Sequence, residues 1–304
     1  IRFIHNGVSR FPETRRECIP HRRTLPANKL PEILRTVLPG EFADEAQSGF
    51  GTFRYFSYLY SMAGLYFHIP FCKRVCAYCD FYKSVDLRCM DPLLESMHRE
   101  LDARREYLGG EPVRTRYFGG GTPSLCAPEA VAGLLDHAAT LFDCTAAEET
   151  TLEANPDDLT PAYLAVLRRA GVNRLSVGIQ SFDDACLKLM NRRHNAAQAV
   201  EAVRSAQREG YENITVDLIF GVPGFGNDTL RRSLDSALAL GVQHISAYHL
   251  TVEPGTAFGR RAARGQFAPV DEATSETEYA LVHETLTGAG FEHYEVSNLS
   301  LIHI

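Results

Sequence analysis

The stretch IPFCKRVCAYCDF, residues 69–81, places Cys72, Cys76 and Cys79 within eight residues, and no fourth cysteine completes the motif. Structural zinc sites use four protein ligands, and His68 is the nearest additional candidate. A disulfide would use two of the three thiols and leave one over. An iron–sulfur cluster held by three cysteines would leave one iron open to bind a further ligand. On spacing alone, these three interpretations remain open.

The remaining cysteines are scattered among apolar or helical segments, and we expect them to fill the core as small free thiols. They are Cys18, Cys89, Cys126, Cys144 and Cys186. A chain of 304 residues can bury a sufficient core without disulfides, so reduced thiols and a cytoplasmic location are expected.

The overall composition is typical of a water-soluble globular protein. The chain is 45% hydrophobic and 23% charged. No apolar run approaches the roughly 20 residues of a membrane span, and no secretory signal is recognisable. The net charge of −7 argues against a nucleic-acid-binding protein, which would usually carry a basic face.

The two ends of the chain differ in character from its middle. Residues 1–61 carry nine Lys and Arg against six Asp and Glu, whereas the rest of the chain has a net charge of −10. The first residue is Ile, and Met62 directly precedes the first convincing strand. Residues 1–61 are therefore expected to be a non-native or disordered extension, and the tail LSLIHI, residues 299–304, to be artefactual. Residues 62–298 then hold the folded domain.

Four stretches share one pattern, in which a helical run stops at a glycine and an alternating strand follows: AGVNRLSVG, EGYENITVD, LGVQHISAY and AGFEHYEVS. Glycine suits the left-handed position just past a helix end. Earlier strands are expected at 64–69, 114–118 and 149–154. Helices are expected from Asp91-Pro92 onward and over 128–142, 160–170, 196–209 and 228–240. This alternation of helix and strand predicts a parallel sheet.

The chemically unusual residues gather at the carboxyl ends of the expected strands. The cysteines follow the first strand, GGGTPS follows the second, and Glu153 and Asp217 lie near the ends of the third and fifth. Active sites lie at this end of βα barrels, so a barrel is predicted. A doubly wound open sheet is the alternative, although GGGTPS lacks the G-x-G-x-x-G spacing of a dinucleotide loop. Two acidic pairs are expected only to cap helices, namely Asp157-Asp158 and Asp183-Asp184.

The cysteine motif, followed by a Gly-Gly-Gly-Thr-Pro loop at the second strand, resembles the radical S-adenosylmethionine (radical SAM) superfamily. The closer resemblance is to the oxygen-independent coproporphyrinogen III oxidase-like proteins. It runs from Leu65 to Asn298 through six motifs in order: YFHIPFCKRVCAYCDF, YFGGGTPS, LEANPDD, RLSVGIQSF, DLIFGVPG and SAYHLTVEPGT. The resemblance implies an α/β fold, a partial (β/α)6 TIM-type radical SAM barrel. Residues 62–298 would hold this barrel and the start of the following region, truncated before the family's C-terminal domain.

The resemblance also implies the cofactors. In this superfamily three cysteines hold a [4Fe–4S] cluster, and the amino and carboxylate groups of S-adenosylmethionine occupy the fourth iron. The corresponding cluster ligands would be Cys72, Cys76 and Cys79.

The contacts to S-adenosylmethionine follow from the same motif positions. Tyr66 and Tyr78 would flank the cluster and the adenosine. The methionine end would be lined by Gly120, Gly121 and Thr122. Further contacts would come from Glu153, Gln180, Arg192, Asp217 and Thr251, with Arg193 as a neighbouring alternative to Arg192.

Two positions distinguish the branches of this family. Where the oxidases carry a fourth cysteine, two residues past the cluster motif, this chain has Phe81. Where they have Arg-Glu-Gln, it has Arg192-Arg193-His194. Both features resemble the haem-chaperone branch, which binds haem and delivers it to acceptor proteins. Oxidative decarboxylation of coproporphyrinogen III to protoporphyrinogen IX remains the alternative.

The partners implied by the resemblance are haem or a porphyrin, a haem-accepting protein and an electron donor, with no nucleic acid. Membrane-associated acceptors stay open, although the chain shows no membrane segment. The branch continues into a C-terminal domain with a His-Asn-x-x-Tyr-Trp motif, whereas this chain has no Trp and ends before that point. His194, His249 and the tyrosines are candidates for haem contact, and their spacing selects none of them.

Overall fold

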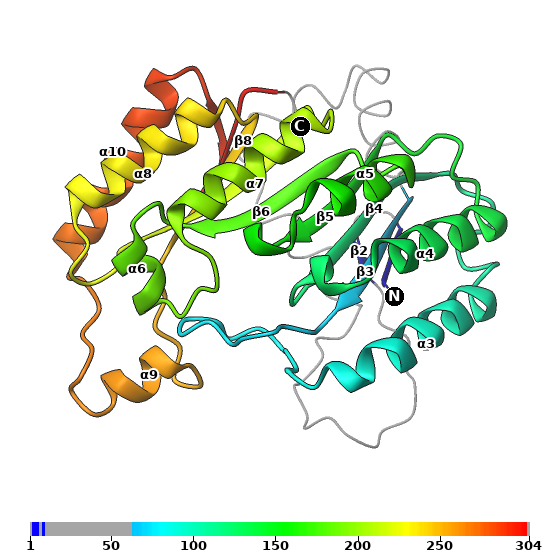
Figure 1. Ribbon diagram of the computed structural model, residues 1–304, viewed down its shortest axis with the longest axis horizontal. Coiled ribbons are helices and arrows are strands. Elements are labelled where there is room, and N and C mark those ends of the chain that lie inside the picture. Colours follow the sequence, from blue (N-terminus) through cyan, green and yellow to red (C-terminus); the bar gives the residue numbers. More distant parts are fainter. Residues whose placement is uncertain (1, 6–7, 10–62, 303–304) are drawn as a thin grey trace, which may run out of the picture.

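The computed structural model describes residues 2–5, 8–9 and 63–302, which form one sheet with helices packed against it (Figure 1). Within the described residues, the sheet has a central part of six parallel strands in sequential order. These strands are β3 (Ala63–Ile69), β4 (Val113–Gly120), β5 (Glu149–Ala154), β6 (Arg174–Gln180), β7 (Asn213–Phe220) and β8 (His244–His249).

A helix follows each of the first five parallel strands, and neighbouring helices pack side by side over one face of the sheet (Figure 1). The main helices are α3 (Met90–Ala103), α4 (Pro128–Leu141), α5 (Pro161–Arg169), α7 (Ala196–Arg208), α8 (Asn227–Leu240) and α10 (Glu272–Gly288). Because βα crossovers are right-handed and the strand order never reverses, successive helices fall on the same face. The partial barrel is therefore confirmed, and the doubly wound alternative is wrong.

Short antiparallel strands extend both edges of this parallel sheet. At one edge, β1 (Arg2–His5) pairs with β3, and β2 (Val8–Ser9) pairs with β1. At the other edge, β10 (Asn298–Ser300) pairs with β8, and β9 (Glu292–Glu295) is outermost. Among the described residues the sheet stays open between these two edges.

The fourth of the repeated stretches, AGFEHYEVS, does not form the parallel strand that its pattern predicts. Gly290 does follow the end of α10 with φ +92°, but β9 pairs with β10 in an antiparallel hairpin. Two residues separate β9 from β10, and so short a link can only reverse the chain. The parallel part of the sheet consequently ends at β8.

The face of the sheet beneath the helices is apolar, as alternation along the strands predicts. Leu65, Phe67 and Phe118 are fully buried there, and the Phe67 and Phe118 rings stack 4.5 Å apart. The opposite face carries half-buried polar and aromatic side chains, which are described below. No helix in the described part of the chain is long and apolar enough to span a bilayer.

The prediction for the scattered cysteines holds only in part. Cys126 and Cys186 are buried, Cys144 is half-buried, and all are free thiols. Cys89 is exposed, so its assignment to the core is wrong. It directly precedes α3 at the surface, where no packed element covers it. Cys18 lies outside the described residues, as does most of the stretch 1–61.

Candidate cofactor site

The loop that carries the three cysteines is held by backbone hydrogen bonds at its base and its tip. At the base, the Cys72 amide donates to the Ser84 carbonyl at 2.9 Å, and the Ser84 amide donates to the Pro70 carbonyl at 2.7 Å. At the tip, the Ala77 amide donates to the Met190 carbonyl, and the Phe258 amide donates to the Ala77 carbonyl, each at 2.9 Å. The loop is therefore anchored to segments that are distant in sequence.

The three thiols are free, half-buried and surrounded by donors. The Thr122 hydroxyl donates to Cys72 Sγ at 3.4 Å, and the Arg192 guanidinium donates to Cys76 Sγ at 3.3 Å. Burial raises the pKa of the Cys72 thiol, and the neighbouring Cys76 and Cys79 add to the rise. No three His, Cys, Asp or Glu side chains among the described residues are grouped as ligands of one metal ion.

The triple glycine lies against the cysteine loop and has no room for side chains. A Cβ on Gly121 would lie 2.7 Å from the Phe71 carbonyl oxygen. Gly120 has φ +119°, and its Cβ would lie 2.6 Å from the His68 ring. The Gly121 amide also donates to the Ile69 carbonyl at 2.8 Å. Only glycine allows the two strand ends to approach this closely.

Strand register brings two carboxylates to the same face of the sheet. Glu153 aligns with Ser176 of β6, and Asp217 aligns with Gly178, two positions further along the same strand. Because side chains alternate with a period of two, Glu153 and Asp217 point the same way. Burial raises the pKa of Asp217, and the nearby negative charge of Glu153 raises it further.

Neither of these carboxylates forms an ion pair within the described residues, although the charges of Arg192 and Arg174 lower the pKa of Asp217. Glu153 accepts hydrogen bonds from the Tyr117 hydroxyl at 2.7 Å and the Gly120 amide at 3.0 Å, and burial raises its pKa. Burial raises the pKa of Asp217 to about 7, while the Ser246 hydroxyl lowers it. Two neighbouring, partly buried acids without a direct ion pair are costly unless a ligand supplies positive charge or hydrogen-bond donors.

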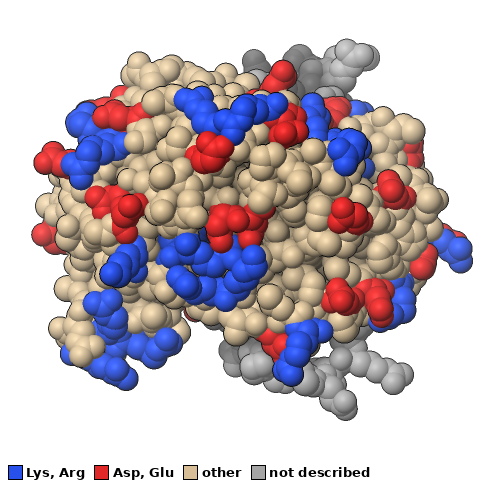
Figure 2. Space-filling model, in the orientation of Figure 1, with Lys and Arg blue, Asp and Glu red and all other residues tan. Residues whose placement is uncertain are grey.

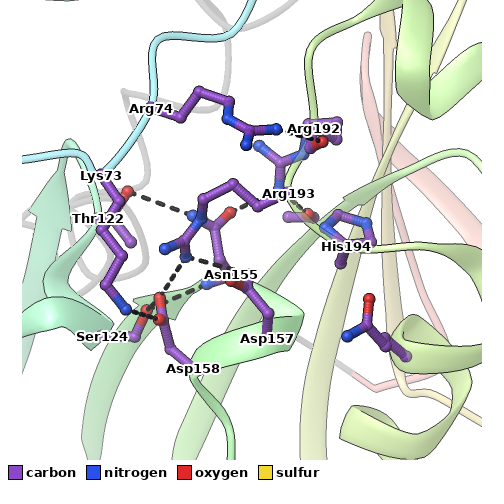
Figure 3. Close-up of polar contacts among 12 residues, drawn as sticks. Lys73, Arg74, Thr122, Ser124, Asn155, Asp157, Asp158, Arg192, Arg193 and His194 are labelled. Carbon is purple, nitrogen blue, oxygen red and sulfur yellow. Dashed lines mark hydrogen bonds and ion pairs between the residues drawn. The ribbon is translucent and has the colours of Figure 1, made fainter.

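Arg192 and Arg193 separate into two different roles. The Arg192 guanidinium reaches into the site, where it donates to Asn155 Oδ1 at 2.5 Å, to the Gly178 carbonyl and to Cys76 Sγ. Its Nε is buried and has no hydrogen-bond partner in the described part of the chain. Arg193 instead points towards Asp157 and Asp158 (Figure 3). Arg192 is thus the arginine beside the thiols.

Asp158 joins three loops at this end of the sheet, which the sequence did not predict. It accepts from Lys73 Nζ at 3.0 Å, Ser124 Oγ at 2.9 Å and Arg193 at 2.8 Å (Figure 3). Its side chain is only 4% exposed. The expectation that Asp157-Asp158 merely cap a helix is wrong, because Thr160 caps α5. Asp183 does cap its helix, as expected, by accepting from the Cys186 amide.

The remaining predicted residues lie around this centre at different depths. Tyr66 stacks on Tyr117 with ring centroids 5.7 Å apart, and Tyr78 packs against a small apolar cluster. Gln180 ends β6 with φ +74° and is buried. Thr251 is exposed in the loop after β8.

Tyr117 was missed at the sequence level although it both stacks on Tyr66 and donates to Glu153. Its position two residues before Gly119 on β4 places it on the site face, so strand alternation could have identified it.

The two histidines considered for haem contact differ in accessibility. His194 is buried, and its Nε2 lies 3.1 Å from the Ile179 carbonyl, so this nitrogen carries the proton and donates. Burial lowers the pKa of His194 to about 4, which keeps the ring neutral. His249 lies at the exposed end of β8, with Nε2 2.9 Å from Ser275 Oγ. His194 is therefore closed to a bulky ligand, whereas His249 is open.

Taken together, these residues fit the cofactors of the family that the motifs resemble. Three thiols offer cluster ligands, and the glycines leave space beside them. Within the described residues, the two carboxylates form no ion pair and the Arg192 Nε has no hydrogen-bond partner. Such a donor set suits a ligand that carries an ammonium group, a carboxylate and hydroxyls.

A family model described as the Radical SAM superfamily matches residues 66–237, which is more than half of the chain. Curated relatives named heme chaperone HemW are 41% identical in Mycobacterium tuberculosis and 36% identical in Escherichia coli. Each of these matches covers 77% of this chain and 61% of the relative. The bovine Radical S-adenosyl methionine domain-containing protein 1, mitochondrial, is 36% identical over 78% of this chain and 54% of its own length. This chain therefore spans only about three fifths of the curated relatives that it matches.

Among solved structures, the coproporphyrinogen III oxidase HemN of Escherichia coli superposes with a TM-score of 0.71. The match has 24% sequence identity and covers 79% of this chain and 55% of that one. At this identity the similarity supports the fold alone, and it agrees with the open, mostly parallel sheet described above.

Proposed function

The chain belongs to the radical SAM superfamily, and from that premise we propose that it serves as a haem chaperone, which binds haem and passes it to acceptor proteins. The observation that carries this proposal is the 36–41% identity to several relatives named heme chaperone HemW, over more than three quarters of this chain. Phe81 adds support, because it stands where the oxidases carry a fourth cysteine.

The three cysteines of the anchored loop are the proposed ligands of a [4Fe–4S] cluster. When bound, the cluster supplies one-electron chemistry at an iron that no protein side chain occupies. The role of the chain is to hold the three thiolates, and the donors from Thr122 and Arg192 lie where they stabilise negative charge on sulfur.

The polar face beside the thiols is the proposed site for S-adenosylmethionine. Glu153 and Asp217 would accept hydrogen bonds from the ammonium and ribose hydroxyl groups, and the Arg192 Nε would donate to the carboxylate. Gly120 and Gly121 would leave room for the methionine end next to the cysteine loop. Tyr66, Tyr78, Thr122 and Gln180 would complete the walls, with Thr251 as an outer contact.

The proposed partners are haem, a haem-accepting protein and a one-electron donor, in the cytoplasm. A haem carrier must bind its cargo reversibly, so no turnover of porphyrinogen is expected. This separates the proposal from the oxidase alternative, which requires oxidative decarboxylation of coproporphyrinogen III.

The test begins with anaerobic reconstitution of the chain and measurement of bound iron and sulfide. Haem is then titrated, and its transfer to an apo-haem protein is followed by absorbance. In parallel, the protein is incubated with reductant, S-adenosylmethionine and coproporphyrinogen III, and protoporphyrinogen and 5′-deoxyadenosine are quantified.

Haem binding and transfer without porphyrin product are the expected results. Repeated turnover to protoporphyrinogen would instead establish the oxidase, and Phe81 would then be a tolerated substitution. The variant Cys72→Ala serves as the control, because it should lose the cluster and leave any cluster-independent haem binding in place.

A further inference from the structure

The segment 81–87, which closes the cysteine loop, displays apolar side chains that the fold leaves uncovered. Phe81 is 75% exposed, Tyr82 79% and Val85 57%, and Leu87 and Val75 are each about 40% exposed. Aromatic side chains normally contribute large buried areas to a core or an interface. Their exposure on one short segment indicates a surface that receives a ligand.

This apolar segment is displayed on a fixed frame. Phe71 and Ser84 form an isolated β-bridge, and the Cys72 amide donates to the Ser84 carbonyl at 2.9 Å. Lys83 Nζ donates to the Cys79 carbonyl at 2.7 Å and to the Phe81 carbonyl at 3.0 Å. The aromatic pair is therefore held at the surface by the same bonds that shape the cysteine loop.

The charge around the segment has the opposite sign to the rest of the domain. Residues 71–89 carry four basic and two acidic side chains, whereas the chain from residue 62 onward has a net charge of −10. Figure 2 shows Lys and Arg side chains gathered near the centre of the face where the loop after β3 crosses in Figure 1. An anionic ligand would be attracted to this part of the surface.

Two of these four cations have no carboxylate partner among the described residues. Lys73 pairs with Asp158, and Arg88 pairs with Asp86. Arg74 contacts only the Arg192 carbonyl, at 3.4 Å, and Lys83 contacts only backbone carbonyls. Arg74 and Lys83 are thus available to bind anionic groups; in the sequence, Arg74 precedes the apolar side chains and Lys83 lies between Tyr82 and Val85.

We propose that Phe81, Tyr82 and Val85, together with the cations Arg74 and Lys83, form the surface that receives haem. This inference rests on the proposed haem-carrier function and names the site. Haem presents an apolar macrocycle and two carboxylates, which match the exposed aromatic side chains and the two unpaired cations. Phe81, Tyr82 and Val85 lie in the loop after β3 and not on the strands that carry Glu153 and Asp217, so the haem macrocycle would lie apart from those two carboxylates. An exposed site also allows direct transfer to an acceptor.

The test compares two double variants in haem titrations of the cluster-loaded protein. Phe81→Ser with Tyr82→Ser removes the proposed contact surface. Tyr294→Ser with Val296→Ser is the matched control, because these side chains are also exposed, at 47% and 71%, but lie on the β9–β10 hairpin. The first pair should weaken haem binding by about tenfold or more, and the control by less than about twofold. Iron and sulfide contents are measured in both to show that the cluster is intact.

The charge contribution is tested with Arg74→Gln and two porphyrins. This variant should weaken the binding of haem several-fold but leave the binding of haem dimethyl ester, which lacks free carboxylates, unchanged. If Arg74→Gln weakens the binding of both porphyrins equally, Arg74 does not contact the haem carboxylates.

The outcomes separate this inference from the proposed function. If the wild-type chain binds and transfers haem, and both double variants do so equally well, the site assignment is wrong while the chaperone proposal stands. If Phe81→Ser with Tyr82→Ser leaves haem binding intact but slows transfer, the surface contacts the acceptor protein instead. If this variant only dissociates a dimer seen by sedimentation, the surface binds a second copy. A wild-type chain that binds no haem overturns both proposals.

Discussion

Two acidic pairs lie at the same end of the sheet and have opposite surroundings. Asp157 and Asp158 are neutralised by Arg193 and Lys73. Glu153 and Asp217 are partly buried beside each other and form no ion pair within the described residues. The first pair links loops to one another, whereas the second is the proposed contact to S-adenosylmethionine. Both pairs consist of acidic residues, so it is the presence or absence of an ion pair that separates a structural role from a proposed binding role.

The largest effect is expected for Asp158→Asn. This change leaves Arg193 and Lys73 without their shared carboxylate, and breaking a largely buried ion pair from one side costs about 2–4 kcal/mol. Chemical denaturation should show this loss in the free energy of unfolding, and the reconstituted protein should release its cluster faster. Unchanged stability and cluster retention would mean that the loops are held by their backbone bonds alone.

Glu153→Gln and Asp217→Asn should primarily affect ligand binding. Each variant replaces a charged acceptor by a neutral amide, so calorimetry should show S-adenosylmethionine bound about ten- to a hundredfold more weakly. The iron and sulfide contents should stay at the wild-type level. Asp158→Asn should weaken S-adenosylmethionine binding less than these two variants do at equal cluster content. If it weakens binding more, Asp158 contacts the ligand and Glu153 and Asp217 do not.

The free protein should become more stable in Asp217→Asn, in contrast to Asp158→Asn. The native pKa of Asp217, about 7, lies above its unfolded value, so ionisation opposes folding. The stability of the wild-type protein should therefore fall as the pH rises from about 4 to about 7. The variant should lose this dependence and gain about 1–3 kcal/mol at pH 8. Denaturation curves at pH 5 and pH 8 measure both quantities.

The same titration predicts how ligand binding depends on pH. Asp217 attracts an ammonium group most strongly when it is ionised, so S-adenosylmethionine binding by the wild-type protein should strengthen as the pH rises through about 7. Calorimetry between pH 6 and pH 8 would measure this, with Asp217→Asn as the control whose affinity stays flat.

The smallest effect is expected for the exposed pair formed by Asp86 and Arg88. These side chains lie in the cysteine loop and form a 2.7 Å ion pair, but both are open to solvent, which screens their attraction. Asp86→Asn should leave the melting temperature and the cluster content unchanged. A loss of stability as large as that of Asp158→Asn would show that exposed and buried ion pairs contribute equally here. The contrast between the two acidic pairs would then no longer depend on burial.

Much of the fold could be predicted because its signals are local. Gly241 follows α8 with φ +67°, and it marked the helix end correctly from sequence. The expected helix at 128–142 corresponds to α4 at Pro128–Leu141. The stretch AGFEHYEVS carried the same local signals and was assigned wrongly, since strand direction depends on the partner strand and not on the repeated pattern.

The sequence by itself determined the order of strands and helices, the spacing of the three cysteines and the need for glycine beside them, because each depends on neighbouring residues. Only the tertiary structure decided that Arg192 reaches the thiols while Arg193 binds Asp158. The two arginines are adjacent and chemically identical, so their roles depend on where the loops after β3, β4 and β5 meet. The juxtaposition of Glu153 and Asp217 was decided in the same way, because the two carboxylates become neighbours, and their pKa values rise, only once the strands are side by side.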